Sequence, residues 1–596
     1  MEPGSRRSGG FFRKLGKLFM FVGIAWSVLL AGGLVTAFVF LSRTPKVPAR
    51  TVLELRLDRK LQAAPSSGGL MDVLNPDRSS LRAVLRALDT GAEDDKVQGL
   101  LVYVGGDHGL ATLQELRDAI VRFRKAGKFA YAFAHSFGEV AGGTGPYYLA
   151  TACDEIWIQP SGSVGITGLR AEVPFVKELL AHVGVKADGQ QRKSYKTAFN
   201  TFTQQGFTEA HAASTASLLE DTLGLLVADI AAARKLEPAR VKELFAQGPF
   251  LAEDALGAKL VDHIGYHDQV LAAVKGRAQG GEMLYTGAYL ERHGDDDEGK
   301  GPKVAVIYGV GTIVDGKGQI DPLSGSATLG AKTIAAALRQ AARDKDVKAV
   351  IFRIDSPGGS YVASDTIWRE TVELRNAGKP LIVSMGDVAA SGGYFVAAGA
   401  TKIVAEPATL TGSIGVYAFK LVTKDLWDKL GVSWGTLSTS PNADLWSSLS
   451  GFSPEDHKRL GRWLDFVYDD FTSKVALGRK MSAEAVEAVA QGRVFTGARA
   501  KELGLVDELG GMETALALAK EAAGLPKDKD VELVPLPERQ GLLERLWGDE
   551  RDSSEDDLES ATWNAAWLER AATWAGHMEA AAPKGAPLQA PVPALH

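Results

Sequence analysis

Cysteine is nearly absent from this chain of 596 residues, which contains only Cys153. A single thiol excludes any disulfide within the chain, so the cysteine content gives no information about the cellular compartment. The simplest role for Cys153 is that of a small core residue. Compartment and chemistry therefore have to be inferred from other features of the sequence.

A strong excess of charge of either sign is also missing. The chain has 67 lysines and arginines against 73 aspartates and glutamates, a net charge of −6. That balance is small for the length and argues against a general nucleic-acid binder. The remaining composition is ordinary for a globular protein, with 66 glycines spread between apolar runs. A chain of this length is expected to contain more than one domain.

The N-terminus contains an uninterrupted apolar run at residues 18–41, preceded by a basic tail at residues 1–17. Roughly 20 apolar residues span a bilayer, whereas the core of a cleavable signal peptide has roughly 7–15. We therefore expect a transmembrane helix, with the basic tail in the cytoplasm and everything after the stalk at residues 42–50 outside. A cleaved signal peptide stays the alternative, and in either case the body is exported.

An internal repeat organises the rest of the chain. Strand-like runs of about 4 to 8 residues alternate with helix-sized segments, which predicts an α/β fold with parallel sheets. The run beginning at Thr51 starts again at Lys303, and late in each copy the motif Leu-Val-Asp recurs, at residues 260–262 and 505–507. The clearest matching segments are Val97–Val104 with Val347–Ile354, Ile156–Pro160 with Ile403–Pro407, and Gly162–Gly165 with Gly412–Gly415.

The repeat predicts two domains of the same fold, at residues 51–278 and 303–538. Between them, residues 279–302 have linker composition, and their acidic run at 295–298 is interpreted as a solvated loop rather than a metal site. Residues 539–596 form an acidic tail with tryptophans spaced to share one helical face. That face predicts a helix that docks on protein, with contact to a membrane interface as the alternative.

The candidate nucleophile lies in the second repeat. Three of its strands end in glycine-rich turns, Asp355–Gly359, Ala390–Tyr394 and Thr411–Gly415. Such turns are expected to meet at the sheet edge where open α/β folds bind ligands. Ser391 precedes two glycines there, whereas the first repeat has Thr144 before Gly-Pro. Ser391 is therefore the candidate nucleophile.

A serine hydroxyl needs a base at neutral pH. The ten histidines of the chain offer none in the glycine-rich turns of the second repeat, so nothing supports a histidine triad. The first repeat offers Lys196, with Lys193 as a competitor, in a segment whose counterpart near Pro441–Asp444 has no lysine. One repeat thus keeps the lysine and the other keeps the serine, which predicts one site shared by both.

These motifs together resemble the long, duplicated bacterial form of the signal peptide peptidase A family. The resemblance covers about residues 18–540 and rests on Ser356–Gly359, Ala390–Tyr394, Thr411–Gly415 and Tyr195-Lys196. It implies tandem ClpP/crotonase-like domains and a membrane-anchored serine peptidase with a Ser-Lys dyad. In that family pattern Ser391 is the nucleophile, Lys196 is the general base and Ser413 orients the lysine.

The chemistry of such a dyad sets further expectations. The lysine must be neutral to act as a base, and burial disfavours its ammonium form. A tetrahedral oxyanion needs preorganised N–H donors, for which Gly358, Gly359 and Gly392 are the candidates. No metal or cofactor is expected.

Substrates and partners follow from the resemblance and from the predicted anchor. We expect cleaved signal peptides and other apolar peptides as substrates, on the outer side of the bacterial cytoplasmic membrane. The resemblance also implies a ring-like homotetramer. Two alternatives remain: a crotonase-like acyl-CoA enzyme, which an exported body disfavours, and a non-catalytic membrane scaffold, which the retention of Ser391 and Lys196 disfavours.

Overall fold

The computed structural model describes residues 46–58, 61–62, 80–139, 142–294, 301–319 and 327–537. The expected basic tail, the transmembrane helix at 18–41, the acidic run at 295–298 and the tail at 539–596 lie outside these residues. Among the described residues, no helix combines the length and the apolar character needed to cross a bilayer. The described chain comprises the two predicted repeats.

The first half folds around a six-stranded sheet in which all paired strands are parallel. Its strands are β1 (Thr51–Arg56), β2 (Val97–Tyr103), β3 (Phe129–Ala134), β4 (Glu155–Ile158), β8 (His263–Ile264) and β9 (Glu282–Tyr285). Their order in space is β8-β4-β3-β2-β1-β9. The predicted parallel α/β architecture is confirmed for this half.

Helices cover both faces of this first sheet. α3 (Leu81–Glu93) and α4 (Leu110–Lys125) bury their apolar stripes against one face. α11 (His267–Arg277) covers the other face through Val270 and Val274. A sheet enclosed in this way requires apolar side chains on both faces. This is why its strands are nearly continuous apolar runs rather than alternating ones.

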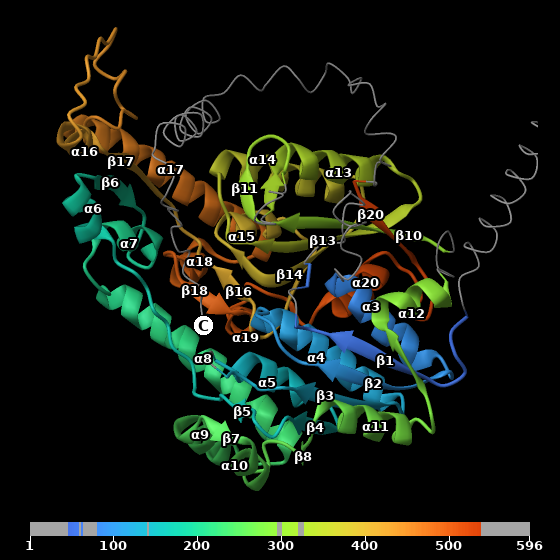
Figure 1. The fold of residues 1–596 in the computed structure, drawn as a ribbon. Coiled ribbons are helices and arrows are strands. Elements are labelled where there is room, and N and C mark those ends of the chain that lie inside the picture. Colours follow the sequence, from blue (N-terminus) through green and yellow to red (C-terminus); the bar gives the residue numbers. More distant parts are fainter. Residues whose placement is uncertain are drawn as a thin grey trace, which may run out of the picture.

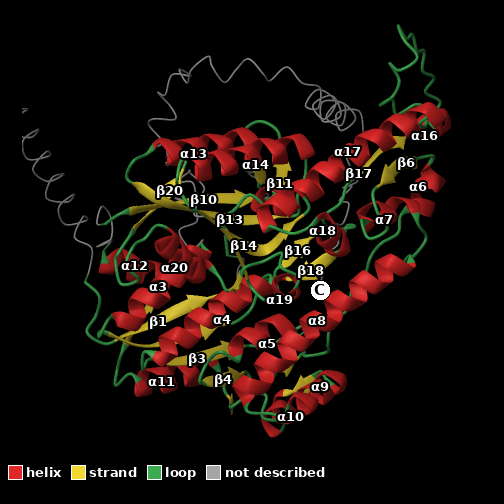
Figure 2. Cartoon of the chain, turned by 180° about the vertical axis from the view of Figure 1, so that it is seen from behind, coloured by secondary structure: helices red, strands yellow, loops and turns green. Residues whose placement is uncertain are grey.

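The second half repeats this plan with an eight-stranded sheet. Its strands are β10 (Lys303–Val310), β13 (Val347–Ser356), β14 (Leu381–Ala390), β15 (Lys402–Ala405), β16 (Leu410–Gly412), β18 (Val494–Thr496), β19 (Glu508–Leu509) and β20 (Glu532–Leu536). α13 (Ala331–Arg343) and α14 (Tyr361–Asn376) run along its outer face in Figure 2. α20 (Met512–Ala522) covers the opposite face.

The remaining elements connect the sheets or extend from them. In the first half they are α5 (Thr144–Ala150), β5 (Ser163–Val164), α6 (Lys177–Val183), β6 (Lys186–Gln191), η1 (Thr197–Phe199), α7 (Asn200–Thr203), α8 (Glu209–Arg234), α9 (Pro238–Gln247), β7 (Phe250–Leu251), α10 (Ala252–Gly257) and α12 (Thr286–His293). In the second half they are β11 (Thr312–Val314), β12 (Thr328–Gly330), α15 (Gly392–Ala397), β17 (Tyr417–Val422), α16 (Lys424–Lys429), α17 (Pro454–Arg479), α18 (Ala483–Val489) and α19 (Gly497–Glu502). Figure 1 shows the first half, blue to green, below the second half, yellow-green to red.

The shared Leu-Val-Asp motif has the same structural task in both halves. Asp262 Oδ1 lies 2.8 Å from Arg234 Nη2 at the end of α8. Its counterpart Asp507 Oδ2 lies 2.7 Å from Arg479 Nη1 at the end of α17. Each aspartate also accepts a backbone N–H from the adjacent sheet strand, β4 or β15. The repeated motif thus ties a long helix to the sheet in each copy.

Part of the segment predicted as a linker, residues 279–302, has regular structure. β9 pairs parallel with β1, with Leu284 opposite Leu53, and α12 follows it. β20 pairs with β10 in the same manner in the second half. The two apolar residues Met283 and Leu284 are too few to show a period among glycines and charges. Composition alone therefore did not reveal this edge strand.

A two-stranded ribbon joins the halves away from the two sheets. β6 of the first half pairs antiparallel with β17 of the second, from Lys186 opposite Val422 to Gln191 opposite Tyr417. Figure 1 shows this ribbon at the left, beside α6 and α16. Because Lys196 follows β6 by five residues, the ribbon brings its segment of the first half onto the second half.

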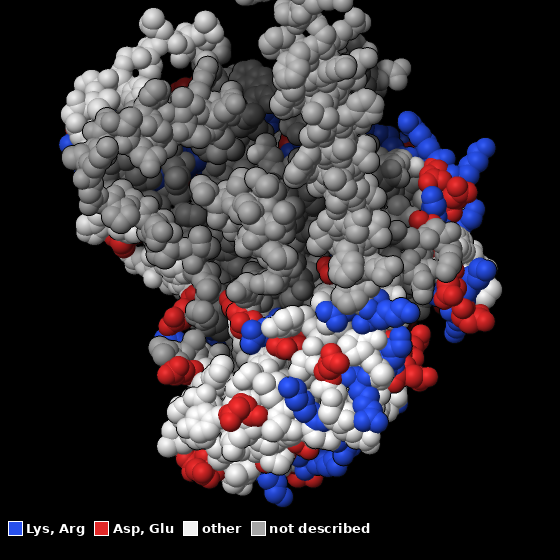
Figure 3. Space-filling view, turned by 45° about the vertical axis from the view of Figure 1, so that its right-hand side comes forward, with Lys and Arg blue, Asp and Glu red and all other residues white. Residues whose placement is uncertain are grey.

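Charged side chains of both signs are interspersed on the described part of the surface visible in Figure 3. This pattern matches the near balance of basic and acidic residues in the sequence. Mixed signs cancel at a distance, so this part of the surface has no extended field of one sign.

A buried ion pair lies where the two halves meet. Glu115 Oε2 of α4 lies 2.6 Å from Arg353 Nη2 of β13, and both side chains are less than a tenth exposed. The other carboxylate oxygen accepts the N–H of Met512 (2.6 Å), while Arg353 Nη1 donates to Ser384 Oγ (2.8 Å). The pair is therefore satisfied on both sides and depends on docking of the halves.

Removing the charge of Glu115 is expected to destabilise the docked halves. Glu115→Gln leaves the Arg353 guanidinium buried without a counter-ion, which costs about 3–5 kcal/mol in buried pairs. Urea unfolding should show this loss in the variant. The matched control is Glu243→Gln, in an exposed pair with Arg240, for which the change should stay below about 1 kcal/mol. Equal effects of the two substitutions would contradict the importance of this contact.

Candidate active site

Ser391 occupies the sharp turn between β14 and α15. Its backbone has φ 55° and ψ −118°, a region that residues with a side chain rarely adopt. The conformation is held by the N–H of Ser391, which donates to the carbonyl of Gly412 (2.9 Å). Ser391 as a residue is partly exposed. Strain of this kind at a partly exposed serine is typical of a functional residue.

Glycines allow the loop after β13 to approach this turn closely. Gly358 has φ +103°, and a Cβ there would lie 2.9 Å from Ser391 Cβ and 2.6 Å from Gly392 N. A Cβ on Gly392 would in turn lie 2.7 Å from Ser364 Oγ. Any larger residue at either position would push the two turns apart. The sequence-predicted glycines therefore lie together around Ser391.

The backbone amides of these glycines differ in what they contact. The N–H of Gly358 donates to Ser356 Oγ (3.2 Å). Ile313 accepts the N–H of Ser360 and donates to the carbonyl of Gly358, both at 2.9 Å. In this parallel bridge the N–H of Gly359 faces away from Ile313. The N–H of Gly392 belongs to the first turn of α15, where helical amides have no partner within the helix.

Lys196 of the first half reaches the serine of the second half. Its Nζ lies 2.9 Å from Ser391 Oγ, 2.9 Å from Ser413 Oγ and 2.9 Å from the carbonyl oxygen of Ser413. The residue is only 4% exposed. Burial lowers the pKa of the Lys196 amine to about 7. The structure thus brings together three of the residues that the sequence singled out.

The three contacts match the bonding capacity of an amine. A neutral amine has two N–H donors and one lone pair, whereas an ammonium has three donors and no lone pair. If both N–H groups point to the two oxygens of Ser413, the lone pair faces Ser391 Oγ. That arrangement can accept the proton of the serine hydroxyl. A pKa near 7 makes the neutral form available at neutral pH.

The competing base candidates lie elsewhere. Lys193 is 42% exposed at its side chain and its Nζ lies 3.0 Å from Glu487 Oε1. His457 contacts Gln190 and Asp188. Within the described residues, no group of three or more histidine, cysteine, aspartate or glutamate side chains could hold a metal ion.

The first half has lost the geometry of the serine turn. Tyr147 and Tyr394 are structural counterparts, since their hydroxyls donate to Leu260 and Leu505 respectively. Counting back, Thr144 corresponds to Ser391, but it is the first residue of α5 and lies in the helix. A β-branched residue is poorly suited to positive φ. Of these two equivalent positions, only Ser391 therefore lies in a strained turn.

Sequence reasoning missed Gly492, which lies against the backbone of Lys196. Its φ is +86°, and a Cβ there would lie 2.3 Å from Lys196 N. A signal was present in the repeat, because Ala-Gln-Gly occurs at 246–248 and again at 490–492. The repetition identifies a turn, but only the tertiary structure shows that it touches the lysine.

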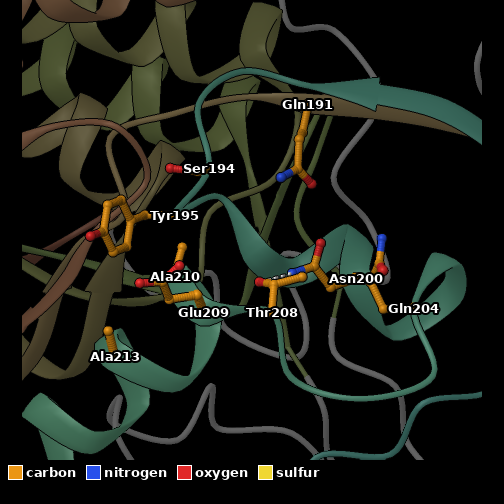
Figure 4. A pocket seen from close by; sticks show the side chains of 9 residues that line it. All are labelled: Gln191, Ser194, Tyr195, Asn200, Gln204, Thr208, Glu209, Ala210 and Ala213. Carbon is orange, nitrogen blue, oxygen red and sulfur yellow. Dashed lines mark hydrogen bonds between the residues drawn. The ribbon is translucent and has the colours of Figure 1, made fainter.

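A polar hollow of about 600 Å³ lies beside the lysine segment. Figure 4 shows its lining, which comes entirely from the first half: Gln191, Ser194, Tyr195, Asn200, Gln204, Thr208, Glu209, Ala210 and Ala213. Tyr195 forms one side of the hollow and directly precedes Lys196 in the chain. The hollow thus borders the segment that carries Lys196, although neither Ser391 nor Ser413 lines it.

Comparison with known proteins gives a consistent family match. The model of peptidase family S49 matches twice, at residues 123–279 and 373–526, once in each half. The chloroplastic serine protease SPPA of Arabidopsis thaliana is 33% identical over 75% of this chain and 66% of its own length. Protease 4 of Salmonella typhi is 31% identical over 75% of this chain and 72% of its own. Protease 4 of Haemophilus influenzae is 31% identical over 77% of this chain and 75% of its own length.

Replacing the buried lysine should stabilise the fold in a pH-dependent way. An unfolded lysine has a pKa of about 10.4, so between pH 7 and 10 only the unfolded chain holds this proton. Stability from this group therefore rises with pH across that window, and the full penalty is present below pH 7. Lys196→Met should be more stable than the parent by about 3–5 kcal/mol at pH 6.

Urea unfolding of both proteins at pH 6, 8 and 9.5 measures this difference. Other groups titrate alike in parent and variant, so the difference isolates Lys196. It should shrink steadily as the pH rises toward 10. A difference that is constant with pH would mean that the folded protein does not lower the pKa of this amine.

Proposed function

We propose that this chain, which belongs to peptidase family S49 and is a serine peptidase, hydrolyses peptide bonds with a Ser391–Lys196 dyad. The observation that carries the proposal is the 2.9 Å separation between Lys196 Nζ and Ser391 Oγ, with the lysine buried. Ser-Lys pairs are a known variant of the catalytic triad. Each half of the chain supplies one member.

The proposed reaction begins with proton transfer from Ser391 Oγ to the neutral amine of Lys196. The oxygen attacks the substrate carbonyl carbon, and the resulting oxyanion is stabilised by backbone N–H donors. As the C–N bond breaks, the lysine ammonium returns the proton to the leaving amine. Lys196 then takes a proton from water, which attacks the acyl ester, releases the acid and restores the serine hydroxyl.

The glycines and Ser413 have separate roles in this scheme. Gly359 and Gly392 are the proposed oxyanion donors, because the N–H of Gly359 faces away from Ile313 and the N–H of Gly392 lies in the first turn of α15, directly after Ser391. Gly358 allows the two turns to approach, since its own N–H already donates to Ser356 Oγ. Ser413 is the proposed orienting residue, because its two oxygens accept from Lys196 Nζ without adding charge.

The proposed substrates are cleaved signal peptides and other apolar peptides. An aromatic group beside the lysine segment supports an apolar preference. Phe202 of the first half stacks on Phe419 of β17 and Phe199 contacts the same ring at a tilt, with ring centroids 5.1 Å apart in both pairs. Tyr417 of the same strand is 38% exposed. An extended apolar peptide would find ring surface there, close to Lys196 in the chain.

We further propose that residues 18–41 anchor the enzyme in the bacterial cytoplasmic membrane, with its body on the outer side. The apolar run and its basic flank support this topology. The proposed catalytic body comprises two domains, the first extending from residue 51 through β9 and α12 to residue 293 and the second covering residues 303–538, and the resemblance of the motifs favours a homotetramer. A non-catalytic scaffold would not require a buried lysine aimed at a strained serine.

Removing either member of the dyad should abolish peptide hydrolysis. With an apolar peptide carrying a fluorogenic amide, kcat should fall on the order of 10⁴-fold or more in Ser391→Ala and in Lys196→Ala. Lys193→Ala is the matched control, because this neighbouring lysine pairs with Glu487 and should leave activity unchanged. Activity retained by Ser391→Ala would overturn the proposed nucleophile, and activity retained by Lys196→Ala would overturn the base.

The pH dependence of the rate should report the amine of Lys196. Only the neutral amine accepts a proton, so kcat/KM should rise about tenfold per pH unit below pH 7 and level off above it. Steady-state rates from pH 5 to 9 measure the profile. A profile that is flat from pH 5 to 7 would contradict a lysine base whose pKa is about 7.

A further inference from the structure

A short loop of the second half, residues 491–493 between α18 and β18, packs against the segment of the first half that contains Lys196. The N–H of Gly492 donates to the carbonyl of Ile414 (2.7 Å). Opposite this bond, the missing side chain of Gly492 leaves room for the backbone of Lys196, since a Cβ would lie 2.5 Å from Lys196 Cα. The loop is therefore fixed to the segment after β16 that contains Ser413, and it packs against Lys196.

Arg493 contacts the candidate site through both its backbone and its side chain. Its carbonyl oxygen accepts the N–H of Ser413 (2.6 Å). Its guanidinium carbon lies 4.1 Å from the centre of the Tyr195 ring, the residue next to Lys196. A guanidinium over an aromatic face is attracted by the ring electrons. One residue thus contacts both Ser413, whose oxygens accept from the Lys196 amine, and Tyr195, which precedes Lys196 in the chain.

Within the described residues, the guanidinium of Arg493 makes only a weak hydrogen bond besides its contact with Tyr195. Its Nη1 donates to the carbonyl of Ala488 at 3.3 Å, which is a long bond. Both Tyr195 and Arg493 are half-buried. Tyr195 also lines the polar hollow in Figure 4 and directly precedes the buried Lys196 in the chain.

We propose that Arg493 and Tyr195 form a clasp that positions the Lys196 amine against Ser391 and keeps water from it. The inference rests on the proposed dyad and deepens it. It names the residues that hold Lys196 of the first half in a fixed position relative to Ser391 of the second half. A lysine side chain has four flexible methylenes, and a displacement of about 1 Å costs catalysis on the order of 100-fold. No local chain segment connects the lysine to the serine, so a contact between the halves must supply this precision.

Opening the clasp should impair catalysis and shift its pH dependence together. In Arg493→Ala and Tyr195→Ala, kcat should fall about 10–100-fold while KM changes less than about threefold. Water that reaches the amine should raise the pKa seen in the acid limb of kcat by about one unit. Tyr195→Phe keeps the ring and should retain activity within about threefold of the parent, whereas Arg493→Lys, which loses the planar stack, should be intermediate.

The matched control is Arg499→Ala. Arg499 also bridges the halves, through Asp221 of α8 at 3.0 Å, but contacts neither Lys196 nor Ser413. Its kcat and pH profile should equal those of the parent. Urea unfolding of every variant shows whether the fold is intact.

The outcomes separate the clasp from the dyad. Parental kcat and pH profile in Arg493→Ala and Tyr195→Ala would overturn the clasp, while inactive Ser391→Ala and Lys196→Ala would still support the dyad. A loss of kcat with an unshifted acid limb would also overturn it, because a merely structural role predicts that pattern. Full activity of Ser391→Ala would instead remove the dyad on which the clasp depends.

Discussion

The burial of one amine at the junction of two domains is the constraint on which the rest of this structure depends. Lys196 is almost inaccessible and has a pKa of about 7, which is what a lysine needs to accept a proton at neutral pH. Neither half could provide that environment alone, because the lysine comes from one and its oxygen partners from the other. In the proposed mechanism, docking of the halves therefore creates the general base, and features that secure docking are indirectly part of the proposed site.

Several features of the domain junction and of the proposed site lower the stability of the fold. Glu115 and Arg353 are buried as an ion pair, Ser391 has a strained backbone, and Lys196 is enclosed among neutral oxygens. Buried charges and strained dihedrals persist only where surrounding contacts over-determine them. The two sheets, each with helices on both faces, supply the surrounding stabilising contacts. The ribbon of β6 and β17 adds continuous backbone pairing between the halves. The stable frame thus supports a locally unfavourable site.

Duplication explains why the frame is repeated but the site is not. Both copies keep the aspartate that ties a long helix to the sheet, as Asp262 and Asp507. Only the second copy keeps a small residue at the turn before the short helix, where Ser391 adopts positive φ and Thr144 lies in the helix. Packing requirements apply to each copy separately, whereas one site needs each chemical group only once. The copies were therefore free to diverge at the turns and not in the cores.

The sequence by itself determined the parallel α/β plan, the two repeats and the candidate Ser391, because apolar periodicity and glycine-rich turns are local signals, whereas the roles expected of Lys196 and Ser413 came from the resemblance of the motifs to a known family. It did not reveal β9, whose two apolar residues show no period, nor the contact of Gly492 and Arg493 with Lys196, which joins residues nearly 300 positions apart. Only the tertiary structure decided between Lys196 and Lys193 as the lysine beside Ser391, since burial and distance are not written in composition. A pKa likewise depends on the surroundings that folding assembles, and those surroundings come from both halves at once.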